Sequence, residues 1–205
     1  MSPTTRTLLF ALTVLSTTAL AHGNLLTNGG AEAGNLSSWT HTGAIASTGI
    51  NQTMGHVAPY EGNWFFSIHT NVGGGGAMSQ GGTTGMSADQ LILTGMVQTE
   101  DLKYGDGIGE YAEILLTILD FEDSPIAMAS TPIIRTRNLQ WVPFQVVLDV
   151  PQNADHWDVN LTGTMQEGSY VNVFFDSVSL TPEPATLILS AAGLPFLLKR
   201  KRNRQ

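Results

Sequence analysis

Two carboxylates near opposite ends of the chain, Glu32 and Asp176, are the strongest candidates for a site with its own chemistry. Asp176 precedes Val178 and Leu180 at a spacing of two, so a strand would point its side chain into the core beside theirs. A buried carboxylate without a partner is costly. Glu32 lies in a glycine-rich turn whose carbonyl oxygens can face an ion, and hard oxygen ligands of this kind suit Ca²⁺. The pair predicts a structural calcium site; the alternative is that Asp176 accepts backbone N–H bonds while Glu32 is solvated.

The residue types that carry most enzymatic chemistry form no recognisable motif. The five histidines are scattered without H-E-x-x-H spacing, no G-x-S-x-G sequence occurs, and the chain has no cysteine. Paired carboxylates such as those at 100–101 and 122–123 are adjacent within turns rather than opposed across a cleft. The sequence therefore predicts a protein that is not an enzyme.

Period-two alternation predicts the elements that must position the two carboxylates. Apolar residues alternate with polar ones, and Val, Ile, Phe and Thr are frequent, in the segments 64–69, 91–97, 112–119, 144–150, 157–161 and 171–180. The glycine run 73–76 lacks the Lys and Ser/Thr of a phosphate loop and is expected to be a flexible loop. About eight strands without crossover helices imply an all-β fold, an antiparallel jelly-roll β-sandwich.

The N-terminus has the three parts of a secretory signal peptide. Arg6 gives a positive n-region, an apolar h-region follows, and Ala19 and Ala21 form an A-x-A cleavage site. We therefore expect residues 1–21 to be removed and the mature protein to begin at His22.

A free amine at His22 would allow one enzymatic alternative. The amine and the ring could chelate copper together with a second histidine, an arrangement that resembles lytic polysaccharide monooxygenases, which are also secreted β-sandwiches. The sequence singles out no second histidine, so a copper polysaccharide monooxygenase is the remotest alternative.

At the other end of the chain a tripeptide, a short apolar run and a basic cluster follow one another. They are Pro182, Glu183 and Pro184, then residues 185–198, then Lys199, Arg200, Lys201 and Arg202. The apolar run would be ~21 Å long as a helix, shorter than the ~30 Å hydrocarbon core of a membrane. It is expected to form a short transmembrane helix, with the basic cluster on the cytoplasmic side.

These parts, over residues 182–205, resemble the PEP-CTERM sorting signal of Gram-negative, biofilm-forming bacteria. The resemblance implies export by the secretion machinery and processing near the tripeptide by exosortase, an integral-membrane cysteine protease. It places the protein in the cell envelope, held to the membrane by its tail or released into the extracellular matrix. An ordinary tail anchor is the alternative.

The part between the two ends, residues 22–181, is expected to be one domain and is strongly acidic. Sixteen acidic residues face three basic ones there, a net charge of −13. Such a surface repels nucleic acid and anionic lipid and attracts divalent cations. Without cysteines, the domain must depend for stability on its core and on the predicted metal.

Four separated segments carry a second resemblance. They are 24–32, 59–65, 141–144 and 174–180. In this order they resemble galactose-binding-domain-like β-sandwiches, which include several carbohydrate-binding modules. That resemblance implies a Ca²⁺ held between the first and last strands, at Glu32 and Asp176. Two positions depart from the pattern: Ala31 stands where Phe is usual, which thins the core, and Ser177 stands where a second Asp is common.

Sugar binding would require exposed aromatic rings. The four tryptophans are expected in the core or at its edge: Trp39, Trp64, Trp141 and Trp157. Four tyrosines near loops remain as sugar platforms or ordinary rim residues: Tyr60, Tyr104, Tyr111 and Tyr170. The sequence therefore favours an exported, non-catalytic protein with a structural or binding role in an exopolysaccharide or biofilm matrix; the alternative is a carbohydrate-binding module.

Overall fold

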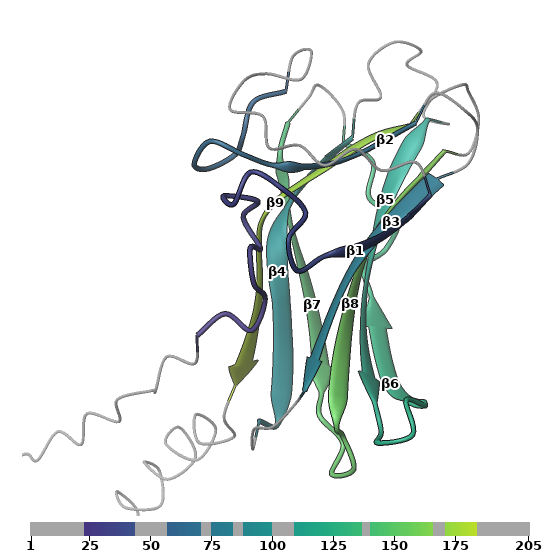
Figure 1. Cartoon of the computed structure of the whole chain (residues 1–205). Helices are drawn as coiled ribbons and strands as arrows, with labels where there is room; N and C mark the ends of the chain where they lie inside the picture. The colour runs from purple at the N-terminus through teal and green to yellow at the C-terminus, as the bar shows by residue number, and fades with distance from the viewer. Residues whose placement is uncertain are drawn as a thin grey trace, which may run out of the picture.

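The protein is a two-layered β-sandwich, seen in a computed structural model (Figure 1). The structure describes residues 23–43, 57–70, 75–83, 88–99, 109–136, 140–165 and 171–183. One sheet has the order β1 (Thr40–Gly43), β3 (Gly75–Thr83), β8 (His156–Met165), β5 (Glu110–Leu119), β6 (Pro125–Ser130). The other has the order β2 (Phe66–Thr70), β9 (Val171–Glu183), β4 (Gln90–Thr99), β7 (Val142–Asp149).

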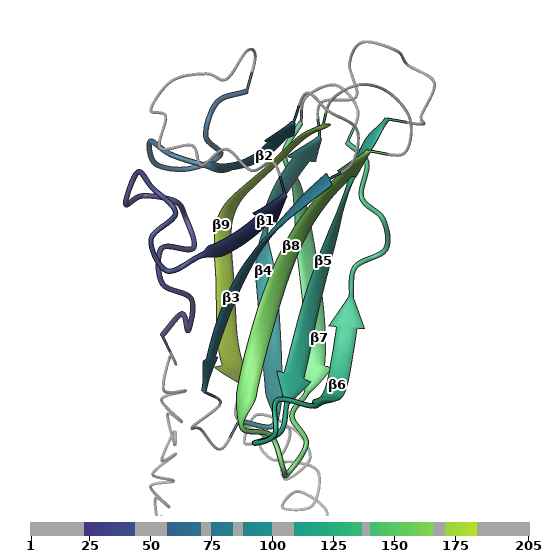
Figure 2. The same cartoon turned by 45° about the vertical axis from the view of Figure 1, so that its right-hand side comes forward.

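All pairings between these strands are antiparallel, and the two sheets face each other across one core (Figure 2). In β8, Trp157, Val159 and Leu161 are buried while the residues between them are partly exposed, as period two requires. From the other sheet, Leu93 and Phe175 meet them in the same apolar cluster with no exposed surface. The expected all-β jelly-roll sandwich is confirmed.

Each of the expected alternating segments overlaps a strand, but three strands have no such pattern in the sequence. These are β1, β3 and β6. The expectation that 73–76 is a loop is wrong for Gly75 and Gly76, which pair with Thr164 and Gly163 in β8. A Cβ at Gly75 would lie 2.5 Å from the carbonyl oxygen of Gly163, so glycine is needed for this close approach.

The segment 24–32 lies beside β9 instead of forming a regular first strand (Figure 1). Leu25 N donates to Leu180 O at 2.8 Å, and Val178 N donates to Gly29 O at 3.0 Å. The Asn24 side chain adds bonds to both β9 residues, with Nδ2 donating to Val178 O and Oδ1 accepting from Leu180 N. The two ends of the domain are therefore joined by hydrogen bonds along one line.

Strand β9 continues beyond residue 181, where the domain was expected to end. Pro182 pairs with Leu91 and Glu183 pairs with Gln90 of β4. Pro184, the apolar run 185–198 and the basic cluster lie outside the described residues, as does the signal peptide. Within the described part of the chain, no helix is long and apolar enough to cross a membrane.

Gly29 and Gly30 give a matched test of the close contact between segment 24–32 and β9. A Cβ at Gly29 would lie 2.0 Å from Val178 O, whereas at Gly30 the nearest atom would be Glu32 Cγ at 3.8 Å. Gly29→Ala should therefore destabilise the domain by about 1–3 kcal/mol through overpacking, which lowers the melting temperature by roughly 2–12 °C. Thermal unfolding followed by circular dichroism measures this. Gly30→Ala should change little, and equal effects of the two substitutions would contradict the close approach.

Candidate functional site

A β-bulge at Ser177 determines the direction of the Asp176 side chain. Met96 pairs with Asp176 and Thr94 pairs with Ser179, so Ser177 and Val178 together lie opposite Gly95. Ser177 has φ of 51°, in the left-handed region that such a bulge requires. The extra residue reverses the alternation of β9 at this point.

The prediction that the Asp176 side chain points into the core is therefore wrong. Asp176 shares the outer face of the sheet with Phe174, while Phe175 and, after the bulge, Val178 face the core. The predicted burial is nevertheless correct, since Asp176 is only 1% exposed. A period-two reading could not detect the bulge because Ser177 is not a residue type that signals a positive φ.

The segment 57–65 covers Asp176 on this outer face. Val57, Phe65 and Phe174 form a second, smaller apolar cluster, with Trp141 packed against it. The ring of Phe65 contacts those of Phe174 and Trp141 edge to face, at centroid distances of 5.5 and 6.1 Å. Trp141 Nε1 donates to Ala58 O at 3.0 Å, which fixes the covering segment to β7 at its margin.

Backbone N–H groups of this covering segment compensate the buried charge of Asp176. Its Oδ2 atom accepts hydrogen bonds from Tyr60 N at 2.8 Å and Glu61 N at 3.2 Å. Its Oδ1 atom accepts one from Ser177 N at 2.6 Å. The predicted alternative, in which Asp176 accepts backbone N–H bonds, describes these contacts.

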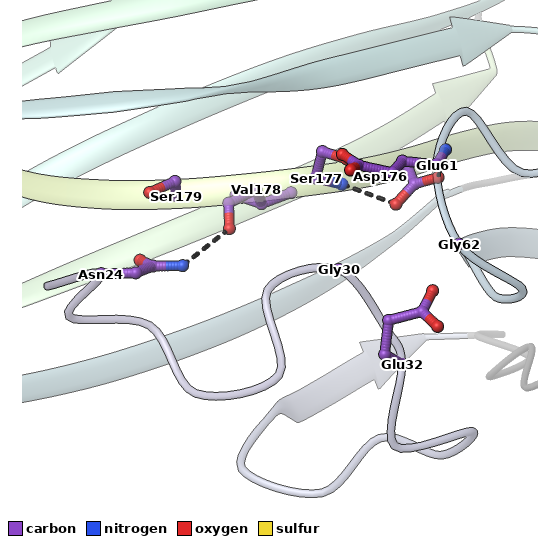
Figure 3. Close-up of a pocket in the computed structure, with 9 residues that line it drawn as sticks. All are labelled: Asn24, Gly30, Glu32, Glu61, Gly62, Asp176, Ser177, Val178 and Ser179. Atoms are coloured by element: carbon purple, nitrogen blue, oxygen red, sulfur yellow. Dashed lines mark hydrogen bonds between the residues drawn. The ribbon is translucent and has the colours of Figure 1, made fainter.

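Glu32 holds the same segment from the other side (Figure 3). Its Oε1 atom accepts from Asn63 N at 3.1 Å and Trp64 N at 3.2 Å, and its Oε2 atom lies 3.3 Å from Asn63 N. Gly62 has φ of 66°, and a Cβ there would lie 2.3 Å from Glu32 Oε1. We call this arrangement the carboxylate clasp: Asp176 bound to the N–H groups of residues 60 and 61, and Glu32 bound to those of residues 63 and 64.

Burial raises the pKa of Asp176 above its ordinary value, because the charged form loses hydration. The three backbone N–H bonds act in the opposite direction and lower the pKa, while the negative charge of Glu32 raises it further. The net shift is upward. The pKa of Asp158, on β8 in the other sheet, is also raised by burial.

The clasp supplies oxygen atoms of the type that calcium prefers, but many of their lone pairs are already used. Glu32, Glu61 and Asp176 line one open pocket of about 360 Å³, and Glu61 Oε2 accepts from Ser177 Oγ at 3.4 Å. Among the described residues, no three His, Asp or Glu side chains are placed together as a metal site. Ca²⁺ takes six to eight oxygen ligands. The three backbone N–H bonds offset part of the cost of burying Asp176, and calcium stays a prediction from the sequence.

The aromatic candidates divide as expected into core and rim. Trp39 and Trp157 are buried in the main core, and Trp64 packs against it half-buried. Tyr60 keeps 53% of its surface exposed, whereas the ring of Tyr111 is covered on one face by the Arg135 guanidinium at 5.3 Å. Tyr104 and Tyr170 lie outside the described residues.

Several other predicted site residues also lie outside the described ranges. These are Ala19, Ala21, His22, Pro184, Lys199, Arg200, Lys201 and Arg202. In the sequence, the segment 59–65 stands out only as part of a resemblance. Its role as the hydrogen-bond donor to both carboxylates was missed, because backbone donors leave no signature in residue types.

No family model and no curated protein matches this chain. Solved structures do match. The carbohydrate-binding module TmCBM61 in complex with β-1,4-galactotriose has a TM-score of 0.57 at 16% identity, over 78% of this chain and 99% of that one. A family 16 carbohydrate-binding module has a TM-score of 0.52 at 18% identity, over 77% and 99%.

One structural neighbour is described as an enzyme. It is the enzymatically active domain of tailspike protein 4 from bacteriophage CBA120, with a TM-score of 0.56 at 15% identity. This chain covers about a fifth of it, 21% of its length. The fold is therefore that of carbohydrate-binding module β-sandwiches, and at these identities the likeness concerns the fold alone.

Calcium can be tested through the stability of the domain. An ion that binds only the folded state stabilises it by about 2.7 kcal/mol at a hundredfold excess over Kd. Chelation should therefore lower the melting temperature by roughly 5–11 °C if Glu32 and Asp176 hold Ca²⁺. Differential scanning calorimetry with calcium and with chelator measures the difference.

Variants separate the ion from the hydrogen bonds in the calcium experiment. Asp176→Asn destabilises the domain in either case, since the amide nitrogen cannot accept an N–H bond. Only with a bound ion does Asp176→Asn also abolish the calcium dependence, and Glu32→Gln reduce it. Glu122→Gln, at an exposed turn, is the control. Identical melting curves of a demetallated wild type with and without calcium would leave the clasp as hydrogen bonds alone.

Proposed function

We propose that this chain is an exported, non-catalytic carbohydrate-binding protein that a C-terminal sorting signal delivers to the cell envelope or matrix. The single observation that carries the binding function is Tyr60, an aromatic ring with half of its surface exposed and its backbone held by a buried carboxylate. A ring fixed in this way can stack on a sugar with little loss of side-chain entropy. The likeness in fold to carbohydrate-binding modules supports the same proposal.

The alternative, a purely structural role in the matrix, predicts no glycan affinity. A glycan array probed with the exported chain distinguishes the two. We expect retention of at least one class of oligosaccharide. A blank array on a sample that unfolds cooperatively would favour the structural role.

A second proposal concerns sorting and depends on the resemblance of residues 182–205 to PEP-CTERM signals. Replacing Pro182, Glu183 and Pro184 by Ala should leave export intact and retain the precursor in the membrane fraction. Immunoblots of membrane and medium fractions measure this. A mature species of normal size and location would contradict the sorting function.

The structure sharpens the design of the sorting experiment. Pro182 and Glu183 pair with β4, so the triple replacement also changes the last strand of the fold. Pro184→Ala alone alters the tripeptide beyond the end of β9. If the triple variant were retained but melted several degrees lower, and Pro184→Ala were processed normally, misfolding rather than sorting would explain the retention.

A further inference from the structure

An open pocket of about 510 Å³ lies on the outer face of the four-stranded sheet, beside the carboxylate clasp. We call it the Tyr60 pocket. Its lining includes Tyr60, Thr94, Met96, Pro143, Gln145 and Ser177. Three strands contribute: β4 in the middle, β7 on one side and β9 at the bulge on the other.

The aromatic wall of this pocket is held in place by the fold. Tyr60 N donates to Asp176 Oδ2, and the Tyr60 ring meets Trp141 edge to face at 6.5 Å. Trp141 is itself bonded to Ala58 O. Tyr60 is therefore a 53% exposed residue whose backbone is held by Asp176 and whose ring contacts a tryptophan that is itself hydrogen-bonded. Such preorganisation is what a weakly held ligand requires, because little is lost in ordering the site.

A row of neutral polar side chains lies across the sheet next to this ring. Thr94 pairs with Ser179 on β9 and with Gln145 on β7, and all three are on the outer face. Directly opposed residues have Cβ atoms about 4.5–5.5 Å apart, so the row spans roughly 10 Å. Hydroxyl and amide groups both donate and accept hydrogen bonds, as the hydroxyl groups of a sugar do.

The charges around the pocket restrict its ligand. None of the residues that line it is charged. Two carboxylates are bonded to residues of the lining: Glu61 accepts from Ser177 Oγ, and Asp176 accepts from Tyr60 N. An anionic sugar would be repelled by these groups and by the acidic surface of the domain as a whole.

We propose that the Tyr60 pocket binds one or two residues of a neutral glycan, with a sugar ring stacked on Tyr60 and its hydroxyl groups bonded to Thr94 and Gln145. This inference deepens the proposed function and depends on it. Asp176 of the carboxylate clasp then also contributes to binding, because it positions the backbone of the stacking residue, Tyr60.

The open pocket at the end of the other sheet fits a neutral sugar less well. Its volume is similar, about 530 Å³, but His156, Asp123 and Asp158 line it. The aromatic residue in its lining, Trp157, is 4% exposed and belongs to the core. Trp157 is therefore not available for stacking, and the charges of this pocket favour other ligands.

Isothermal titration of the full exported chain tests the inference. The probes are β-1,4-galactotriose, xylotriose and cellotriose as neutral ligands, and trigalacturonic acid as the anionic one. We expect at least one neutral trisaccharide to bind and the anionic one not to bind. Tyr60→Ala should weaken binding at least tenfold, Tyr60→Phe less than threefold, and Gln145→Ala about three- to tenfold.

Phe121→Ala is the matched control, since Phe121 is an aromatic residue that is 77% exposed and lies outside the lining of the pocket. Its affinity should equal that of the wild type. If the wild type binds and both Tyr60→Ala and Gln145→Ala bind equally well, the pocket is wrong while the carbohydrate-binding function stands. If the anionic probe binds best, the ligand class is wrong. If no glycan binds the wild type here or on the array, both proposals fail.

Discussion

The carboxylate clasp is the constraint on which the arrangement of this domain depends. Residues 58–64 belong to none of the described strands, yet segment 57–65 covers part of the outer face of the four-stranded sheet. Asp176 and Glu32, which come from opposite ends of the domain, bind its N–H groups. By accepting these N–H groups, the two side chains do for an irregular segment what a neighbouring strand does in a sheet.

The clasp exists only because β9 contains a bulge. In a regular strand Asp176 would point into the apolar core beside Val178, where no donor from segment 57–65 could reach it. With Ser177 as the extra residue, the same strand presents Phe175 and Val178 to the core and Asp176 to the outer face. The bulge thus serves both sides of the sheet, and it creates the edge of the Tyr60 pocket.

The fold could be predicted from the sequence to the extent that period-two alternation marks it. The alternating segments became strands because apolar residues at spacing two must share a buried face. Strand β3 was missed because four of its nine residues are glycine. At three of these, Gly75, Gly81 and Gly82, an added Cβ would meet atoms of β8, so the glycines serve close approach and leave no apolar alternation. The two carboxylates were identified, and the burial of Asp176 and its backbone donors were foreseen, the donors as one alternative. The donors to Glu32 and the direction of Asp176 were not. A positive φ at Ser177 and donors supplied by a backbone are tertiary effects that residue types do not encode.

A carboxylate is needed at position 176 even though its burial is unfavourable. Three N–H groups from different peptide units converge on it, and only a side chain with two acceptor oxygens can satisfy all three. Burial and the charge of Glu32 nevertheless raise the pKa of Asp176. The pKa of Asp176 is higher in the folded state than in the unfolded state. Its contribution to stability is therefore greatest at a pH below the unfolded-state pKa, and it declines as the pH rises through the folded-state pKa. At neutral pH the N–H bonds and the second apolar cluster must therefore offset the free energy that burying the charged Asp176 costs. This explains why the clasp and that cluster occur together.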